Sequence, residues 1–182
     1  MKILAIIDMQ NDFVTGALKN DDARSVIRYI KEKIREAKEQ GTTVVFTMDT
    51  HGADYMDTIE GRKLPVPHCI KNTKGWQIID ELEADKYADK IFEKETFGSE
   101  HFVNYIKKNK AHLESITFIG VCTDICVISN AIAAKMVAPN VTIYVDAAGC
   151  AGATPEAHDT ALAEMSACHI DVLNKGKEPW RR

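Results

Sequence analysis

The chain has 182 residues, of which 45% are hydrophobic and 27% are charged, and its formal net charge is −4. This is the composition of an ordinary globular protein, and the length predicts one domain, residues 1–182, with its own core. The weakly acidic balance gives no argument for nucleic acid or an anionic membrane as a partner. No apolar run approaches the length of a membrane span, so we expect no membrane segment.

The five cysteines are an odd number without the spacing of a disulfide framework. Free thiols in a reducing compartment are therefore favoured. Residues 1–8 have neither the apolar core nor the cleavage site of a secretory signal. We therefore expect a cytoplasmic protein.

Apolar runs predict six strands, at residues 2–8, 42–48, 89–94, 115–119, 141–146 and 169–173. Helical spacing predicts helices before Gly41, at residues 76–82 and 101–110, from Thr123 and from Pro155. Asp21 or Asp22 is the predicted N-cap of the first helix. Residues 50–73 show no clear period, and a loop of this length inside a compact domain is usually functional or disordered. Residues 175–182 read as a polar, solvated tail.

This alternation predicts a three-layer α/β/α fold around a doubly wound, mostly parallel six-stranded sheet. In open sheets of this kind, ligands bind outside the carboxyl ends of the strands. The residues that leave these ends are Asp8, Asp49, Lys94, the turn 120–126 and Asp146. Because a carboxylate, a cation and a thiol would then gather at one edge, the pattern favours an enzyme.

The thiol in question is Cys126. Gly120 ends the fourth strand, and the apolar spacing after it predicts a helix with Thr123 as its N-cap. Cys126 would then lie in the first helical turn, where the helix dipole shifts a thiol toward the nucleophilic thiolate. The alternative interpretation is a small buried hydrophobe, as most cysteines are.

Three segments, taken in chain order, resemble the isochorismatase-like cysteine hydrolases. They are DMQNDF at residues 8–13, Lys94 ahead of FGS at residues 97–99, and GVCTDICV at residues 120–127. The resemblance implies a catalytic triad of Asp8, Lys94 and Cys126. It also implies a cis peptide bond between Val121 and Cys122, and an oxyanion hole made by the amides of Cys122 and Cys126.

General chemistry supports these roles. A thiol with a pKa of about 8.5 is only a few per cent thiolate at neutral pH and needs activation. Asp8 would accept its proton and pass it to a leaving amine, while Lys94 stabilises the thiolate and holds Asp8 in place. The plainer alternative is an ordinary ion pair of Asp8 and Lys94 at the rim of the sheet.

A metal site is expected in the long loop. Asp49 and His51 follow the second strand, and His68 returns from a Pro-Val-Pro-His-Cys segment. One carboxylate and two imidazoles suit Zn²⁺, Fe²⁺ or Mn²⁺. The same pattern resembles the metal-dependent nicotinamidases, which implies a divalent metal, most simply zinc, with Glu60 as fourth ligand. Cys69, next to His68, is expected to be structural.

The resemblance implies nicotinamide as substrate, converted to nicotinate and ammonia through a thioester, and thereby a place in NAD salvage. The ring nitrogen would bind the metal, Phe13 would stack on the ring, and Phe97 would take the place of a tryptophan wall that the family often has. The alternatives are a related hydrolase of another small amide, ureide or vinyl ether, or a silent binding or redox protein. We expect a small-molecule amide as partner, a homo-oligomer, and only structural work for His158.

Overall fold

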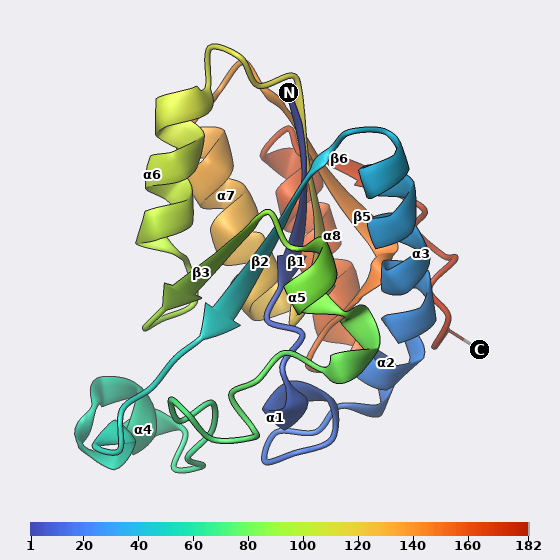
Figure 1. Cartoon of the computed structure of the whole chain (residues 1–182). Helices are drawn as coiled ribbons and strands as arrows, with labels where there is room; N and C mark the ends of the chain where they lie inside the picture. The colour runs from blue at the N-terminus through green and yellow to red at the C-terminus, as the bar shows by residue number, and fades with distance from the viewer. Residues whose placement is uncertain (182) are drawn as a thin grey trace.

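In the computed structural model, which describes residues 1–181, six strands form one parallel sheet in the order β3–β2–β1–β4–β5–β6 (Figure 1). Each neighbouring pair is parallel, where the sequence predicted a mostly parallel sheet. The strands are β1 (Lys2–Ile7), β2 (Thr43–Asp49), β3 (Lys90–Lys94), β4 (Ser115–Val121), β5 (Thr142–Ala151) and β6 (Asp171–Leu173).

Helices cover both faces of the sheet (Figure 1). On one face, α3 (Ile27–Glu39) packs against β1, β2 and β5, with α2 (Asp21–Ser25) beside it. On the other face, α7 (Ile128–Val137) lies between α6 (Glu100–Asn109) and α8 (Pro155–Ala167). Short helices α1 (Asn11–Val14), α4 (Ile59–Lys63) and α5 (Ala84–Tyr87) lie in the connections. Within residues 1–181, none of the helices is long and apolar enough to cross a membrane.

The strand order reverses between β1 and β4, because the chain builds outward from β1 to β3 and then returns to add β4, β5 and β6. Such a switch point leaves a crevice at the carboxyl ends of the two central strands. β1 is buried from Ile3 to Ile7, as a strand covered on both faces requires. The residues that follow β1 and β4 are therefore held by the most buried part of the sheet.

The structure corrects three local predictions. Asn20, not Asp21 or Asp22, caps α2, because its side chain accepts hydrogen bonds from the amides of Asp22 and Ala23. The predicted helix at residues 76–82 is mostly irregular and contains only a 3₁₀ turn, Asp80–Leu82. The expected loop at residues 50–73 includes a 3₁₀ turn, Tyr55–Asp57, and the short helix α4.

Asp146 was expected at a strand end, and this prediction was wrong. β5 continues to Ala151, so Asp146 lies in its interior and pairs with Leu173 of β6. The Asp146 carboxylate accepts hydrogen bonds from Tyr29 (2.8 Å) and Asn174 (3.0 Å). Its role is therefore to fasten α3 and the segment after β6 to the sheet.

Candidate active site

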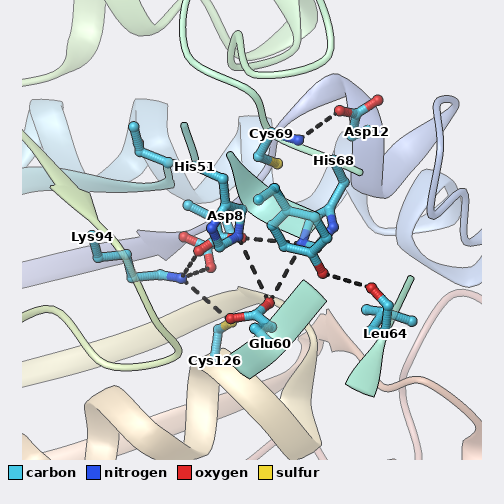
Figure 2. A network of polar contacts seen from close by, with 12 residues as sticks. Asp8, Asp12, His51, Glu60, Leu64, His68, Cys69, Lys94 and Cys126 are labelled. Carbon is cyan, nitrogen blue, oxygen red and sulfur yellow. Dashed lines mark hydrogen bonds and ion pairs between the residues drawn. The ribbon is translucent and has the colours of Figure 1, made fainter. Parts of the chain in front are cut away.

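Asp8, Lys94 and Cys126 meet at the carboxyl edge of the sheet (Figure 2), and Asp49 contacts Lys94 there. Asp8 follows β1 with a positive φ of 49°, Asp49 ends β2 and Lys94 ends β3. Asp49 and Lys94 are register partners on neighbouring strands. Cys126 comes from the turn after β4, on the other side of the switch point.

Lys94 is at the centre of this group. Its ammonium Nζ lies 2.7 Å from Asp8 Oδ2, 3.0 Å from Asp49 Oδ1 and 3.5 Å from Cys126 Sγ. Asp8 is fully buried and Cys126 is only 5% exposed. The structure thus brings together the three residues predicted as a triad, in a site shielded from bulk water.

The protonation of these groups follows from burial and from one another. Burial raises the pKa of Asp8 and Asp49 adds to this, while Lys94 opposes it. Burial would lower the pKa of Lys94, but Asp8, Cys126 and Asp49 raise it well above its usual value. Lys94 is therefore a fixed cation between two carboxylates and a thiol.

The expectation that Cys126 has a depressed pKa was wrong for the resting site. Burial raises the pKa of its thiol well above the usual value, Asp8 raises it further, and Lys94 only partly opposes them. The residues Thr123–Val127 form a single π-turn, and α7 begins only at Ile128, so no regular helix starts at the thiol. Cys126 is thus a thiol at rest and needs a base nearby to become a nucleophile.

Asp8 is positioned by a residue that the sequence did not indicate. The Thr47 hydroxyl on β2 donates to Asp8 Oδ1 at 2.7 Å and accepts from the Asp8 amide at 3.3 Å. In the described part of the chain, Asp8 Oδ2 has no hydrogen bond beyond the Lys94 ion pair. One carboxylate oxygen is therefore fixed and the other is available for a proton.

Side-chain hydrogen bonds also hold the turn that carries Cys126 in place. Thr123, predicted as N-cap, does not cap a helix; Cys122 takes that position, and Thr123 contacts His158 instead. Asn130 donates to the Cys126 carbonyl at 2.8 Å and to the Phe97 carbonyl at 3.0 Å. The fully buried Asn130 side chain thus joins the nucleophile turn to the segment that carries Phe97.

The peptide bond between Val121 and Cys122 is cis, as expected. The amides of Ile125 and Val127 both donate to the Cys122 carbonyl, at 3.1 Å each. Within residues 1–181, the Cys122 amide has no hydrogen-bond acceptor. It is therefore free to donate to an oxyanion.

Four side chains form a cluster beside Lys94: Asp49, His51, Glu60 and His68. Asp49 Oδ2 lies 2.9 Å from His51 Nε2 and 3.4 Å from His68 Nε2. Glu60 Oε1 lies 3.7 and 3.8 Å from the same two nitrogens. One ligand atom from each residue lies within 4.8 Å of all the others. The structure thus brings together all four residues predicted as ligands, Glu60 included.

The chemistry of this cluster fits a divalent cation. Burial would raise the pKa of Asp49, but hydrogen bonds from both histidines and the charge of Lys94 lower it, so the carboxylate is ionised. His68 Nδ1 donates to the Val66 carbonyl at 2.8 Å, so Nε2, which faces the carboxylates, is the atom that would give up its proton to bind a metal. Two imidazoles and two carboxylates are a donor set suited to Zn²⁺, Mn²⁺ or Fe²⁺.

The DMQNDF segment holds this cluster in place. Gln10 donates to the Asp49 carbonyl at 2.8 Å and accepts from the Asp49 amide at 2.7 Å. Asp12 accepts from the Cys69 amide at 2.8 Å, which fixes the residue next to His68 (Figure 2). Cys69 lies outside the group of four, in agreement with a structural role.

A cavity of about 480 Å³ opens over the cluster and the thiol. Its lining includes Cys126, Cys122, Asp49 and His68, together with the apolar side chains Phe13, Phe97 and Leu64. Phe13 packs edge-on against His68, with ring centroids 5.6 Å apart. The same cavity therefore contains the thiol, members of the metal-type cluster and two aromatic side chains.

Comparison with known proteins agrees with this geometry. The family model of the isochorismatase domain matches residues 2–175. The nicotinamidase of Saccharomyces cerevisiae is 26% identical, over 96% of this chain and 100% of that protein. The pyrazinamidase of Pyrococcus horikoshii in complex with zinc has a TM-score of 0.81 at 26% identity, over 94% of this chain and 98% of that one.

A nicotinamidase/pyrazinamidase of Bacillus subtilis has a TM-score of 0.82 at 28% identity, over 95% of this chain and 99% of that one. These relatives are matched over nearly their whole length, so the likeness includes both the sheet and the loops around the cavity. The chain therefore belongs to the isochorismatase family of hydrolases.

Proposed function

We propose that the protein is a nicotinamidase that hydrolyses nicotinamide to nicotinate and ammonia, with Cys126 as nucleophile. The observation that carries this proposal is the position of Lys94, which contacts both the Asp8–Cys126 pair and the metal-type cluster through Asp49. The protein is an amidohydrolase that acts on amide C–N bonds, in keeping with its nicotinamidase and pyrazinamidase relatives. Nicotinamide would engage both parts of the site: its carboxamide would react at the Asp8–Cys126 pair, and its ring nitrogen would bind a metal held by the cluster.

The first half-reaction forms a thioester. Asp8 takes the thiol proton as Cys126 Sγ attacks the carboxamide carbon, and the carbonyl oxygen becomes an oxyanion on the amides of Cys122 and Cys126. Collapse of this adduct breaks the C–N bond, and Asp8 gives its proton to the departing nitrogen as ammonia leaves. Lys94 holds the Asp8 carboxylate in place through both proton transfers.

The second half-reaction releases the acid. Asp8, again a carboxylate, takes a proton from a water that attacks the thioester carbon, and the same two amides bind the new oxyanion. The C–S bond then breaks, and Asp8 returns its proton to the sulfur. Every proton is thus carried by one carboxylate, which agrees with Asp8 Oδ2 having no partner besides the Lys94 ion pair in the described part of the chain.

Asp49, His51, Glu60 and His68 would hold the divalent metal. When bound, the metal would supply a Lewis acid for a ring nitrogen of the substrate. Phe13 and Phe97 would enclose the ring from the sides, and Leu64 would add an apolar contact.

Ammonia release from a panel of small amides tests the proposal. We expect nicotinamide and pyrazinamide to be hydrolysed with kcat/KM in the usual enzymatic range of about 10⁴ M⁻¹s⁻¹ or more, and simple ureides far more slowly. Preference for a ureide would instead assign the protein to another member activity of the same family. No turnover of any amide by metal-loaded protein would contradict the proposal.

Removal of the metal is expected to abolish turnover of nicotinamide. His68→Ala takes away one of four ligands, so we expect both the bound metal per chain and the activity to fall at least about tenfold. The control is His112→Ala, which removes an exposed histidine far from the cluster. Elemental analysis and ammonia release measure the two quantities, and an active His68→Ala protein without metal would contradict the assignment.

A further inference from the structure

The segment after β6 was expected to be a solvated tail, but the described part of it packs against the fold. Glu178 is only 3% exposed. Trp180 packs edge-on against His158, with ring centroids 5.0 Å apart, and its indole nitrogen donates to the Cys150 carbonyl at 2.9 Å. Arg181 forms ion pairs with Glu178 (2.6 Å) and Asp159 (2.7 Å). Arg182 lies outside the described residues.

A chain of hydrogen bonds connects this segment to the nucleophile turn. Thr123 Oγ1 lies 2.7 Å from His158 Nδ1, and His158 Nε2 lies 3.3 Å from Glu178 Oε1. Thr123 and His158 are both fully buried. Thr123 is the first residue of the π-turn that contains Cys126, and α8, which carries His158, packs directly on that turn.

The direction of each hydrogen bond follows from the charges. Burial lowers the pKa of His158, so its ring is neutral at neutral pH. Burial would raise the pKa of Glu178, but hydrogen bonds from Arg181 and from backbone amides bring it to about 2, so it is a carboxylate. A carboxylate can only accept, so His158 Nε2–H donates to Glu178, and Nδ1 must accept from the Thr123 hydroxyl.

We propose that Glu178 is a positioning residue for the nucleophile, acting through His158 and Thr123 to hold the turn that carries Cys122 and Cys126. The inference rests on the proposed role of Cys126. Glu178 fixes the tautomer and the orientation of the His158 ring, and the ring in turn fixes the Thr123 side chain. In the sequence, Thr123 directly follows Cys122, whose amide would bind the oxyanion, and precedes the nucleophile Cys126 by three residues.

The chain explains why a histidine is buried at this position. Both ring nitrogens are paired, and the carboxylate is satisfied by Arg181 and by the Gly176 amide at 3.1 Å. A buried polar network of this kind stabilises one arrangement only while every member is paired. Removal of the carboxylate leaves Nε2–H without an acceptor and frees the ring to turn, so the Thr123 hydroxyl loses its fixed partner.

Glu178→Ala is the main test, and Thr123→Val removes the hydroxyl at the other end of the chain with little change in shape. We expect each to lower kcat for nicotinamide about tenfold with KM changed less than about twofold, because the nucleophile and the oxyanion amides act in the transition state. The double variant should be no worse than the worse single one, since both break the same chain. Glu178→Gln keeps an acceptor for His158 and should stay within about twofold of wild type.

Hydrogen–deuterium exchange gives a measurement that needs no substrate. The Ile125 and Val127 amides, which bond to the Cys122 carbonyl, should exchange faster in Glu178→Ala and Thr123→Val but not in Glu178→Gln. The control is Glu156→Ala, an exposed carboxylate on α8. If wild type hydrolyses no amide, exchange in the turn still tests the positioning role, and the proposed function fails separately.

Unchanged exchange in the turn together with unchanged kcat would overturn the inference. A lower melting temperature in Glu178→Ala with wild-type kcat and turn exchange well below that temperature would also overturn it, since the role would then be stability alone. If Glu178→Ala does not fold, Thr123→Val carries the test. Additive losses in the double variant would show that the two residues act separately, which contradicts the proposed chain.

Discussion

Cys126→Ala is expected to abolish ammonia release while the fold and the metal site remain. The variant removes one buried sulfur atom, which costs about 1 kcal/mol of the free energy of unfolding as a small core deletion. It also removes the atom that would form the thioester, and members of such a catalytic group act as a unit. We therefore expect kcat to fall by at least about 10⁴-fold.

The matched control is Cys168→Ala, which removes an exposed thiol at the C-cap of α8 and should leave turnover unchanged. Ammonia release, circular dichroism and metal content are measured on both variants. Mass spectrometry of the wild-type protein, quenched during turnover, should find an acyl group on Cys126. Wild-type turnover by Cys126→Ala would show that the thiol is not the nucleophile.

The order of the elements was predictable because buried parallel strands leave a strong signal. The runs at residues 2–8, 42–48 and 115–119 are rich in apolar and β-branched residues, as strands covered on both faces require. The rule that ligands bind beyond the carboxyl ends of such strands then placed Asp8, Asp49 and Lys94 together. Both the sheet and the meeting of these charges could therefore be predicted from the sequence.

The same reasoning was wrong where the side chains are small. Residues 147–151 (AAGCA) have no β-branched member and include a glycine, so the end of β5 looked like a loop. Small residues are what this part of the strand needs, because a Cβ at Gly149 would lie 2.7 Å from the Ile119 side chain. The strand was thus ended too early, and Asp146 was wrongly placed at its end.

Residues that position the site were missed because their partners are distant in sequence. Thr47 and Asp8 are 39 positions apart, and Ser99, whose amide donates to Asn130, is 31 positions from it. A threonine in a strand and an asparagine in a helix carry no pattern that distinguishes a positioning role from solvent exposure. The roles of Thr47 and Asn130 become visible only in the folded protein, where β1 pairs with β2 and the nucleophile turn contacts α7.

Asp8→Asn is expected to cause the second large loss. The amide keeps the shape of the carboxylate and its oxygen can still accept from Thr47, so the fold should survive. It cannot take up and return a proton, however, and proposed proton transfers in both half-reactions depend on this group. We expect kcat to fall by about 10²- to 10⁴-fold, with a smaller effect on KM.

The control for this variant is Asp146→Asn, which makes the same change at a buried carboxylate in the interior of β5. Tyr29 can still donate to its amide oxygen, so we expect some loss of stability and nearly unchanged kcat. Steady-state ammonia release and thermal unfolding measure both effects. If Asp8→Asn kept kcat within tenfold of wild type, another group would have to carry the protons of the thiol and the attacking water. The role of Asp8 would then be limited to its ion pair with Lys94. If Asp146→Asn lost activity as fully as Asp8→Asn, the loss would report damage to the sheet rather than the loss of a base.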